Sequence, residues 1–146
     1  MTYLKSAGAA VAAFAIACTI ASAAYAGYAS SAWTYAAANL GYTYEMRSWV
    51  LTGTTASGGT EIRTAGGANV PSGYMGAQAS LWKSGSFCKD TGWAYNSTAR
   101  SLMTAGTPPP DCGSGNYYGD GLVRSYKYNG SYETSYPPGS PYAYQN

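Results

Sequence analysis

Apolar and polar side chains alternate most regularly between Gly73 and Lys83. The first set of alternate positions is apolar and consists of Met75, Ala77, Ala79 and Leu81. The second set consists of Tyr74, Gly76, Gln78, Ser80 and Trp82. Successive side chains of a strand point to opposite faces of a sheet, so this period of two predicts a central β-strand with one face in the core. A weaker alternation over residues 42–52 predicts a second strand.

The stretch 121–136 has the composition of a β-hairpin, because two tyrosine-rich runs flank Asn129 and Gly130. A two-residue hairpin turn needs positive φ at both central positions, which Asn followed by Gly accepts most readily. We expect Tyr128 to pair with Ser131 across this turn. In that register, alternating positions on the two strands hold four tyrosines: Tyr126, Tyr128, Tyr132 and Tyr136.

The remaining segments predict shorter strands, at 61–63, 87–95 and 99–104, separated by turns that include 53–60 and 119–121. Three consecutive prolines at 108–110 cannot donate to a ladder, so they predict an extended connection. The Pro-rich end, 137–146, is expected to lie flat or to fray. Together these patterns predict an all-β fold, an antiparallel β-sandwich of about seven or eight short strands with one disulfide, over residues 41–146.

Residues 1–26 have the layout of a secretory signal peptide. Lys5 precedes an alanine-dominated apolar run, and residues 24–26 form an A-x-A site, so we expect cleavage between Ala26 and Gly27. Residues 21–23 form a second candidate site. A membrane anchor and a lipoprotein acylated on Cys18 are the alternatives. Once the signal is removed, we expect no segment that spans a membrane.

Removal of residues 1–26 leaves two cysteines, Cys88 and Cys112. An even number of cysteines in an exported chain predicts that they are bonded to each other. The bond would close a loop in which the two cysteines are 24 positions apart. The chain-entropy model assigns about 3–4 kcal/mol of stabilisation to closing a loop of this length. The first residues of the mature chain, 27–40, are expected to form a flexible or partner-docking leader, or a first strand.

Charge and residue types exclude several classes of function. The formal net charge is +2 and the basic residues are dispersed along the sequence, so no nucleic-acid partner is expected. The chain has no histidine, which excludes histidine-activated serine or cysteine nucleophiles and Cys/His zinc sites. Six carboxylates remain, and most fall in turns or on strand faces, so we expect neither an enzyme nor a cofactor.

The aromatic residues are the better candidates for function, because 16 tyrosines and four tryptophans exceed what one small core can bury. Flat rings on a sheet face can stack on sugars or anchor a protein partner. We expect two tryptophans in the core and two at the surface, with Trp49 and Trp82 opposite the core positions. The candidate binding residues are Trp33, Trp49, Trp82, Trp93, Tyr126, Tyr128 and Tyr132.

Two stretches of the chain resemble known proteins. Residues 69–76, followed by Leu81-Trp82-Lys83-Ser84-Gly85 and a cysteine, resemble small exported proteins of actinobacteria, including streptomycetes, that have no assigned function. Residues 116–139 are similar to the carboxyl-terminal part of lactococcin-like bacteriocins, which are small secreted β-sandwich proteins. The spacing around Pro138-Gly139 departs from the bacteriocins, so no functional residue is carried over.

These observations predict a secreted, extracellular binding protein without enzymatic activity. The first hypothesis is a bacteriocin-like protein or a subunit of a secreted antibacterial assembly, with a secreted protein or a component of the bacterial cell envelope as its partner. The alternative is a carbohydrate- or cell-wall-binding module that uses exposed Trp and Tyr rings. A second alternative is a structural cell-surface protein, in which tyrosine-rich edges pair between copies to form a homo-oligomer.

Overall fold

A computed structural model describes residues 27–146 of the protein. The predicted signal peptide and Ala26 lie outside the described residues. The described part forms β-strands and no helix, so it contains no helix able to cross a membrane. The strands are β1 (Tyr28–Ser30), β2 (Thr34–Asn39), β3 (Tyr42–Leu51), β4 (Ser57–Thr64), β5 (Met75–Lys83), β6 (Ser86–Asp90), β7 (Ala94–Tyr95), β8 (Leu102–Gly106), β9 (Gly115–Tyr126), β10 (Tyr132–Ser135) and β11 (Ala143–Gln145).

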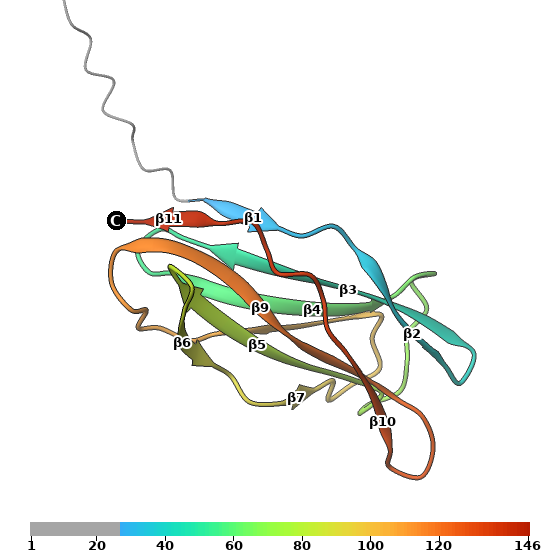
Figure 1. The fold of residues 1–146 in the computed structure, drawn as a ribbon. Helices are drawn as coiled ribbons and strands as arrows, with labels where there is room; N and C mark the ends of the chain where they lie inside the picture. Colours follow the sequence, from blue (N-terminus) through green and yellow to red (C-terminus); the bar gives the residue numbers. More distant parts are fainter. Residues whose placement is uncertain (1–26) are drawn as a thin grey trace, which may run out of the picture.

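The strands form two antiparallel sheets that face each other (Figure 1). In the five-stranded sheet the order is β1-β3-β4-β8, and β2 also pairs with β3. In the six-stranded sheet the order is β10-β9-β5-β6, with β11 beside β9 and β7 beside β5. The predicted all-β sandwich is therefore confirmed, although it has more strands than the seven or eight expected.

Two of the additional strands, β1 and β2, lie within residues 27–40, the segment expected to form a leader. Tyr28–Ser30 pairs with the end of β3, and Thr34–Asn39 pairs with its beginning. Residues 27–40 therefore belong to the five-stranded sheet, which is the first-strand alternative. The carboxyl-terminal end is also ordered, because β11 pairs with β9 and the Gln145 amide both donates to and accepts from the backbone of Gly53.

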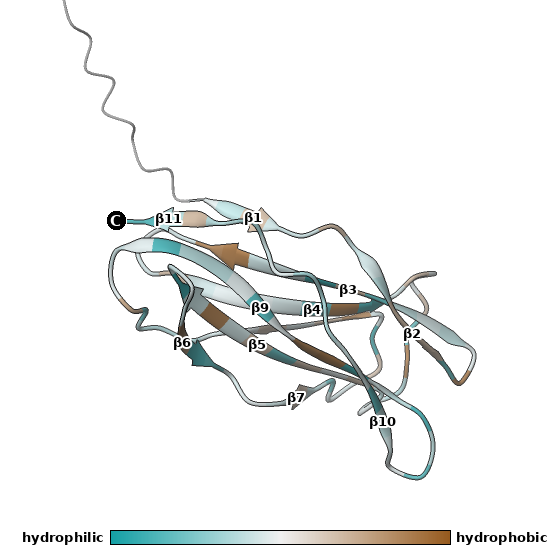
Figure 2. Cartoon of the chain, in the orientation of Figure 1, coloured by the Kyte–Doolittle hydropathy of each residue, from teal (hydrophilic) through white to brown (hydrophobic). Residues whose placement is uncertain are grey.

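The core lies between β5 and the facing strands of the other sheet. The four apolar positions predicted to face inward on β5 are all fully buried, which confirms its period of two. Three of these residues form the larger cluster with Tyr44, Met46 and Ile62, and Leu81 belongs to the smaller one. Figure 2 shows the strongly hydrophobic residues as short segments within β3, β4, β5 and β9. Many of the buried side chains are alanines, so the sheets must approach closely to fill the interior.

Glycines make this close approach possible between β9 and the other sheet. Gly119 and Gly121 were expected in a turn, but both lie inside the continuous strand β9. A Cβ atom on Gly119 would overlap the carbonyl oxygen of Trp49 in the facing sheet, and a Cβ on Gly58 would lie 2.6 Å from the carbonyl oxygen of Ser80. At Gly119 and Gly58 the backbones of the two sheets therefore touch, and at Gly121 a Cβ atom would overlap the Thr60 hydroxyl of the facing sheet.

The hairpin between β9 and β10 exists, but its register differs by one residue from the prediction. Asn129 and Gly130 both have positive φ, and the Ser131 N–H donates to the Tyr128 carbonyl, as expected for the turn. The Ser131 carbonyl, however, accepts from Lys127 rather than from Tyr128. Lys127 and Tyr128 therefore both lie opposite Ser131, and the strand has one extra residue there, which forms a bulge.

Because of that bulge, Tyr126 lies directly opposite Tyr132, with their ring centroids 5.5 Å apart in an edge-on arrangement. Tyr128 is left exposed at the turn.

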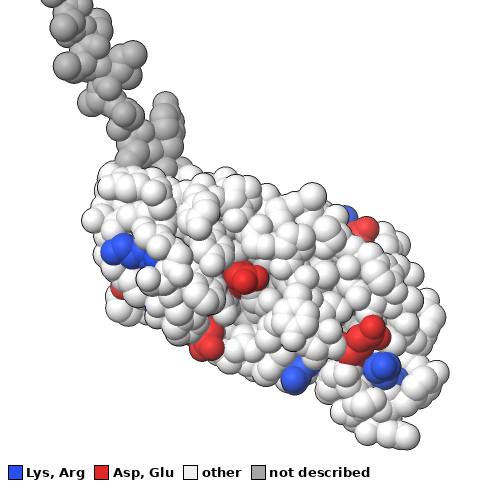
Figure 3. Space-filling model, in the orientation of Figure 1, with Lys and Arg blue, Asp and Glu red and all other residues white. Residues whose placement is uncertain are grey.

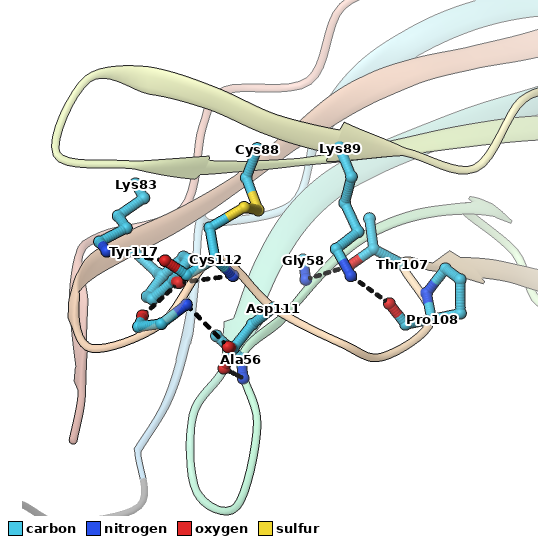
Figure 4. Close-up of a disulfide and its surroundings, with 11 residues drawn as sticks. Ala56, Gly58, Lys83, Cys88, Lys89, Thr107, Pro108, Asp111, Cys112 and Tyr117 are labelled. Atoms are coloured by element: carbon cyan, nitrogen blue, oxygen red, sulfur yellow. Dashed lines mark hydrogen bonds between the residues drawn. A yellow bond between two sulfur atoms is a disulfide. The ribbon is translucent and has the colours of Figure 1, made fainter.

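The predicted disulfide joins Cys88 on β6 to Cys112 in the Pro-rich connection, with the Cα atoms 6.1 Å apart (Figure 4). Asp111, beside Cys112, accepts hydrogen bonds from the N–H groups of Ala56 and Gly113. These two donors hold the pKa of its carboxyl below the ordinary value. The connection between β8 and β9 is therefore tied to both sheets.

Candidate binding surfaces

The indole of Trp49 lies flat on the outer face of the five-stranded sheet. Its side chain leaves β3 and covers Gly59 on β4, where a Cβ atom would overlap the ring. It reaches as far as Gly106 on β8, where a Cβ atom would lie 3.3 Å from the ring. The register places Gly59 opposite both Trp49 and Gly106. Two glycines in adjacent strands thus provide a bed for one tryptophan, which is half-buried.

Trp33 forms a second ring on the same face. It precedes β2 and lies over two guanidinium groups, 4.5 Å from that of Arg47 and 3.9 Å from that of Arg63. Both arginines are also paired with carboxylates, Arg47 with Glu61 and Arg63 with Glu45. Cation–π contacts and ion pairs on rigid strands hold the Trp33 ring in place.

Tyr28 extends this surface beyond Trp49, with the two ring centroids 6.2 Å apart and the planes inclined by 28°. We name the surface formed by Tyr28, Trp33 and Trp49, with Arg47 and Arg63, the indole platform. Tyr28 is 55% exposed, so its ring is open to solvent. The strand positions from Leu51, opposite Tyr28, to Glu45, opposite Arg63, give the platform a length of about 20 Å.

A hollow of about 300 Å³ lies beyond Arg63, at one end of the indole platform. Its walls are formed by Arg63, Thr64, Ala65, Gly67, Ser101 and Leu102. Along the outward positions of β4 and β8, the surface thus passes from the glycines under Trp49, through the paired arginine and glutamate side chains, to this hollow.

The outer face of the six-stranded sheet carries two aromatic clusters. The first contains Trp82 with Phe87, Tyr118 and Tyr142, and the Trp82 and Tyr118 ring centroids are 6.0 Å apart. The second contains Tyr74, Trp93, Tyr95, Tyr126 and Tyr132. In it the Arg124 guanidinium lies 3.9 Å from the Trp93 ring. Burial raises the pKa of Tyr118 in the first cluster and of Tyr132 in the second.

The structure corrects the expected placement of the tryptophans. All four are half-buried on outer faces, so none belongs to the core and an even division between core and surface is wrong. Alternation did place Trp49 and Trp82 correctly, but Trp33 and Trp93 follow no regular strand pattern. Of the tyrosines in the hairpin, Tyr126 and Tyr132 belong to a cluster and Tyr128, which is 68% exposed, does not.

The carboxylates do not gather into a site among the described residues. Glu45 and Glu61 are paired with arginines, and Asp111 caps a loop. No group of three or more acidic, cysteine or histidine residues in the described part of the chain is arranged to hold a metal ion. The expectation that the protein is not an enzyme stays a prediction.

Comparison with protein-family models, with curated proteins and with solved structures finds no match. The resemblances to actinobacterial exported proteins and to bacteriocins therefore stay predictions. Any functional assignment rests on the geometry of the two outer faces.

Proposed function

We propose that the protein is a secreted, non-enzymatic binding protein that holds a glycan on its indole platform. The observation that carries this proposal is the indole of Trp49, whose inner face rests on Gly59 and Gly106 while the residue keeps part of its surface in solvent. A flat ring fixed on a sheet suits the apolar face of a pyranose, since both surfaces are flat and lose little freedom on contact.

The charges around the platform support a neutral or weakly charged glycan. Arg47 and Arg63 are each paired with a carboxylate, so the four side chains carry no net charge. They still offer N–H donors and carboxylate acceptors at the edge of the rings, and Thr104 donates to Glu61 beside them. Sugar hydroxyls need donors and acceptors of this kind, and hydrogen bonds to charged groups are the stronger ones.

Export is supported by the disulfide, because such bonds form and persist in oxidising compartments. A cell-wall polymer such as peptidoglycan, or a free polysaccharide such as chitin or cellulose, is the class of ligand that an exported platform of this shape would meet.

Retention on insoluble polysaccharides tests the proposal. We expect the purified protein to be retained on at least one of peptidoglycan, chitin and cellulose. Loss of the Trp49 ring face removes about 2 kcal/mol, so Trp49→Ala should weaken retention by about 30-fold. Trp93→Ala, which truncates a tryptophan on the opposite sheet, is the matched control and should bind normally.

Gly59→Ala gives a second test, because it leaves every ring in place. The added methyl group overlaps the Trp49 indole and must push the ring off its bed. We expect Gly59→Ala to weaken retention on the polymer, as Trp49→Ala does. If the wild type binds none of the polymers, or if Trp49→Ala binds as well as the wild type, the proposed function is wrong.

A bacteriocin-like protein or assembly subunit is the second candidate. It is favoured by the aromatic side chains on the six-stranded sheet, of which Phe87 is 55% and Tyr142 60% exposed. Large exposed rings are frequent anchors in protein interfaces. Growth inhibition of competing bacteria by the purified protein, alone or with co-secreted proteins, would support this candidate, and blank assays would count against it.

A further inference from the structure

Five consecutive outward-facing side chains of β9 have a chemical pattern that is symmetric about its centre. After the outward-facing Asn116, they are in order Tyr118, Asp120, Leu122, Arg124 and Tyr126. A tyrosine stands at each end and Leu122 at the centre. Between them lie two side chains of opposite charge, Asp120 on one side of Leu122 and Arg124 on the other. β9 is one of the two central strands of its sheet, so this row runs through the middle of the outer face.

The two charges in this row have no ionic partner among the described residues, where the only ion pairs are those on the other sheet. Asp120 accepts a hydrogen bond from the N–H of Gly121. Arg124 donates to the hydroxyls of Tyr95 and Thr134. The residues opposite them on β5, Ser80 and Gly76, are uncharged. Asp120 and Arg124 have opposite charges and lie four residues apart on one strand. Figure 3 shows few charged side chains on a mostly uncharged surface.

We propose that the outer face of the six-stranded sheet binds a second copy of this chain, forming a two-fold symmetric dimer. A two-fold axis lying between the sheets and perpendicular to the strands places β9 on its copy in the opposite direction. Asp120 then meets the Arg124 of the second copy, and the reverse pair forms on the other side of the axis. Leu122 meets itself, and Tyr118 meets Tyr126.

Only this orientation pairs the charges. If the two copies of β9 ran in the same direction, Asp120 would meet Asp120 and Arg124 would meet Arg124. A second copy supplies the complementary pattern without further assumption, whereas an unrelated protein partner would have to supply it independently. The charge pattern thus selects both the occupant and its orientation.

The face is large enough for a stable dimer. The sheet has four rows of strands about 4.8 Å apart, because β11 continues the row of β10 and β7 continues that of β6. With a length of about 30 Å, these rows cover about 600 Å² on each copy, or about 1,200 Å² in total. This area lies at the lower end of the range for specific interfaces. The aromatic clusters at both ends supply rings of the kind that anchor such interfaces.

Sedimentation velocity over about a hundred-fold range of concentration tests the dimer. The protein, expressed as the full chain and purified from the medium, should sediment as a dimer at the upper end of that range. Asp120→Arg places like charges together at both pairs and should raise the dissociation constant by about a hundred-fold or more. Arg124→Asp should do the same.

The charge swap Asp120→Arg with Arg124→Asp restores both pairs and should restore the dimer, which a general loss of folding would not allow. Arg100→Asp, an exposed charge reversal outside this face, is the matched control and should dimerise normally. A monomer at every concentration overturns the proposal. So does a dimer that Asp120→Arg leaves intact, because another surface must then form it.

Discussion

Tyr44 and Tyr117 are the largest fully buried side chains among the described residues, and the Tyr44 ring lies in the larger core cluster. The Tyr44 hydroxyl has no hydrogen-bond partner among the described residues. A buried hydroxyl without a partner loses its hydrogen bonds to water and gains none in return. Burial is also the main reason that the pKa of Tyr44 is raised from 10.0 to about 12. The neighbouring hydroxyls of Tyr42 and Tyr74 add to the shift.

Replacing Tyr44 by Phe removes this hydroxyl and keeps the ring. We expect the free energy of unfolding at pH 7 to rise by about 1 kcal/mol, measured by urea denaturation. The variant should also lose less stability at high pH. Folding raises the pKa of Tyr44, so keeping its hydroxyl protonated contributes to the stability of the wild type in full below pH 10.0. This contribution falls as the pH rises towards about 12, and Tyr44→Phe has no such group to lose.

Tyr117→Phe is the matched control, since Tyr117 is equally buried but its hydroxyl accepts from the Cys112 N–H and donates to the Gly113 carbonyl. This variant should lose about 1–2 kcal/mol. If Tyr44→Phe is as destabilising as Tyr117→Phe, the Tyr44 hydroxyl has a partner that the described contacts do not contain.

Individual residues also show how far the sequence predicts the binding surface. Trp49 was placed on an outer face by alternation, because β3 has a regular period of two. The platform around it was not predictable. Its bed comes from Gly59 and Gly106, which lie far apart in the sequence and meet only through sheet pairing. Trp33 reaches Arg47 and Arg63 because β2 pairs with β3 and β3 pairs with β4.

At the scale of the element, β9 is the strand whose packing depends most on the absence of side chains. Gly119→Ala should lower the free energy of unfolding by about 3 kcal/mol or more, because the added methyl group overlaps the backbone of β3 and neither strand can yield alone. Denaturant unfolding measures this loss. Gly66→Ala is the control: it has open space around the new methyl group and should change stability by less than about 0.5 kcal/mol. Equal stability of the two variants would contradict the close contact of the sheets.

Strands that follow a simple period were predicted, and strands that depend on partners were not. β5 was predicted with its core positions because apolar and polar residues alternate along it without interruption. β9 was divided by an expected turn because Gly119-Asp120-Gly121 has turn composition. Glycine is favoured in turns and at close backbone contacts alike, and only the facing sheet decides between the two. β1, β2 and β11 are likewise defined by their pairing with longer strands.

At the scale of the whole molecule, the two outer faces have separate roles in the proposed account. A dimer formed through the six-stranded sheets would turn its two indole platforms away from each other. Two platforms that point in opposite directions cannot both engage one flat surface, but they can bridge two separate polymer chains. The monomeric Asp120→Arg variant should therefore keep its retention on an insoluble glycan and lose the ability to cross-link chains of a soluble glycan, which light scattering measures.

The central claim is that a glycan binds on the indole platform, and the indole N–H signals of the four tryptophans test it most directly. Trp33 and Trp49 report on one face, and Trp82 and Trp93 report on the other. Nuclear magnetic resonance of the ¹⁵N-labelled protein, titrated with soluble fragments of the retained polymer, follows all four at once. The account predicts saturable shifts of the Trp33 and Trp49 signals while those of Trp82 and Trp93 stay in place. Shifts confined to Trp82 and Trp93, or no shift with any glycan, would contradict it.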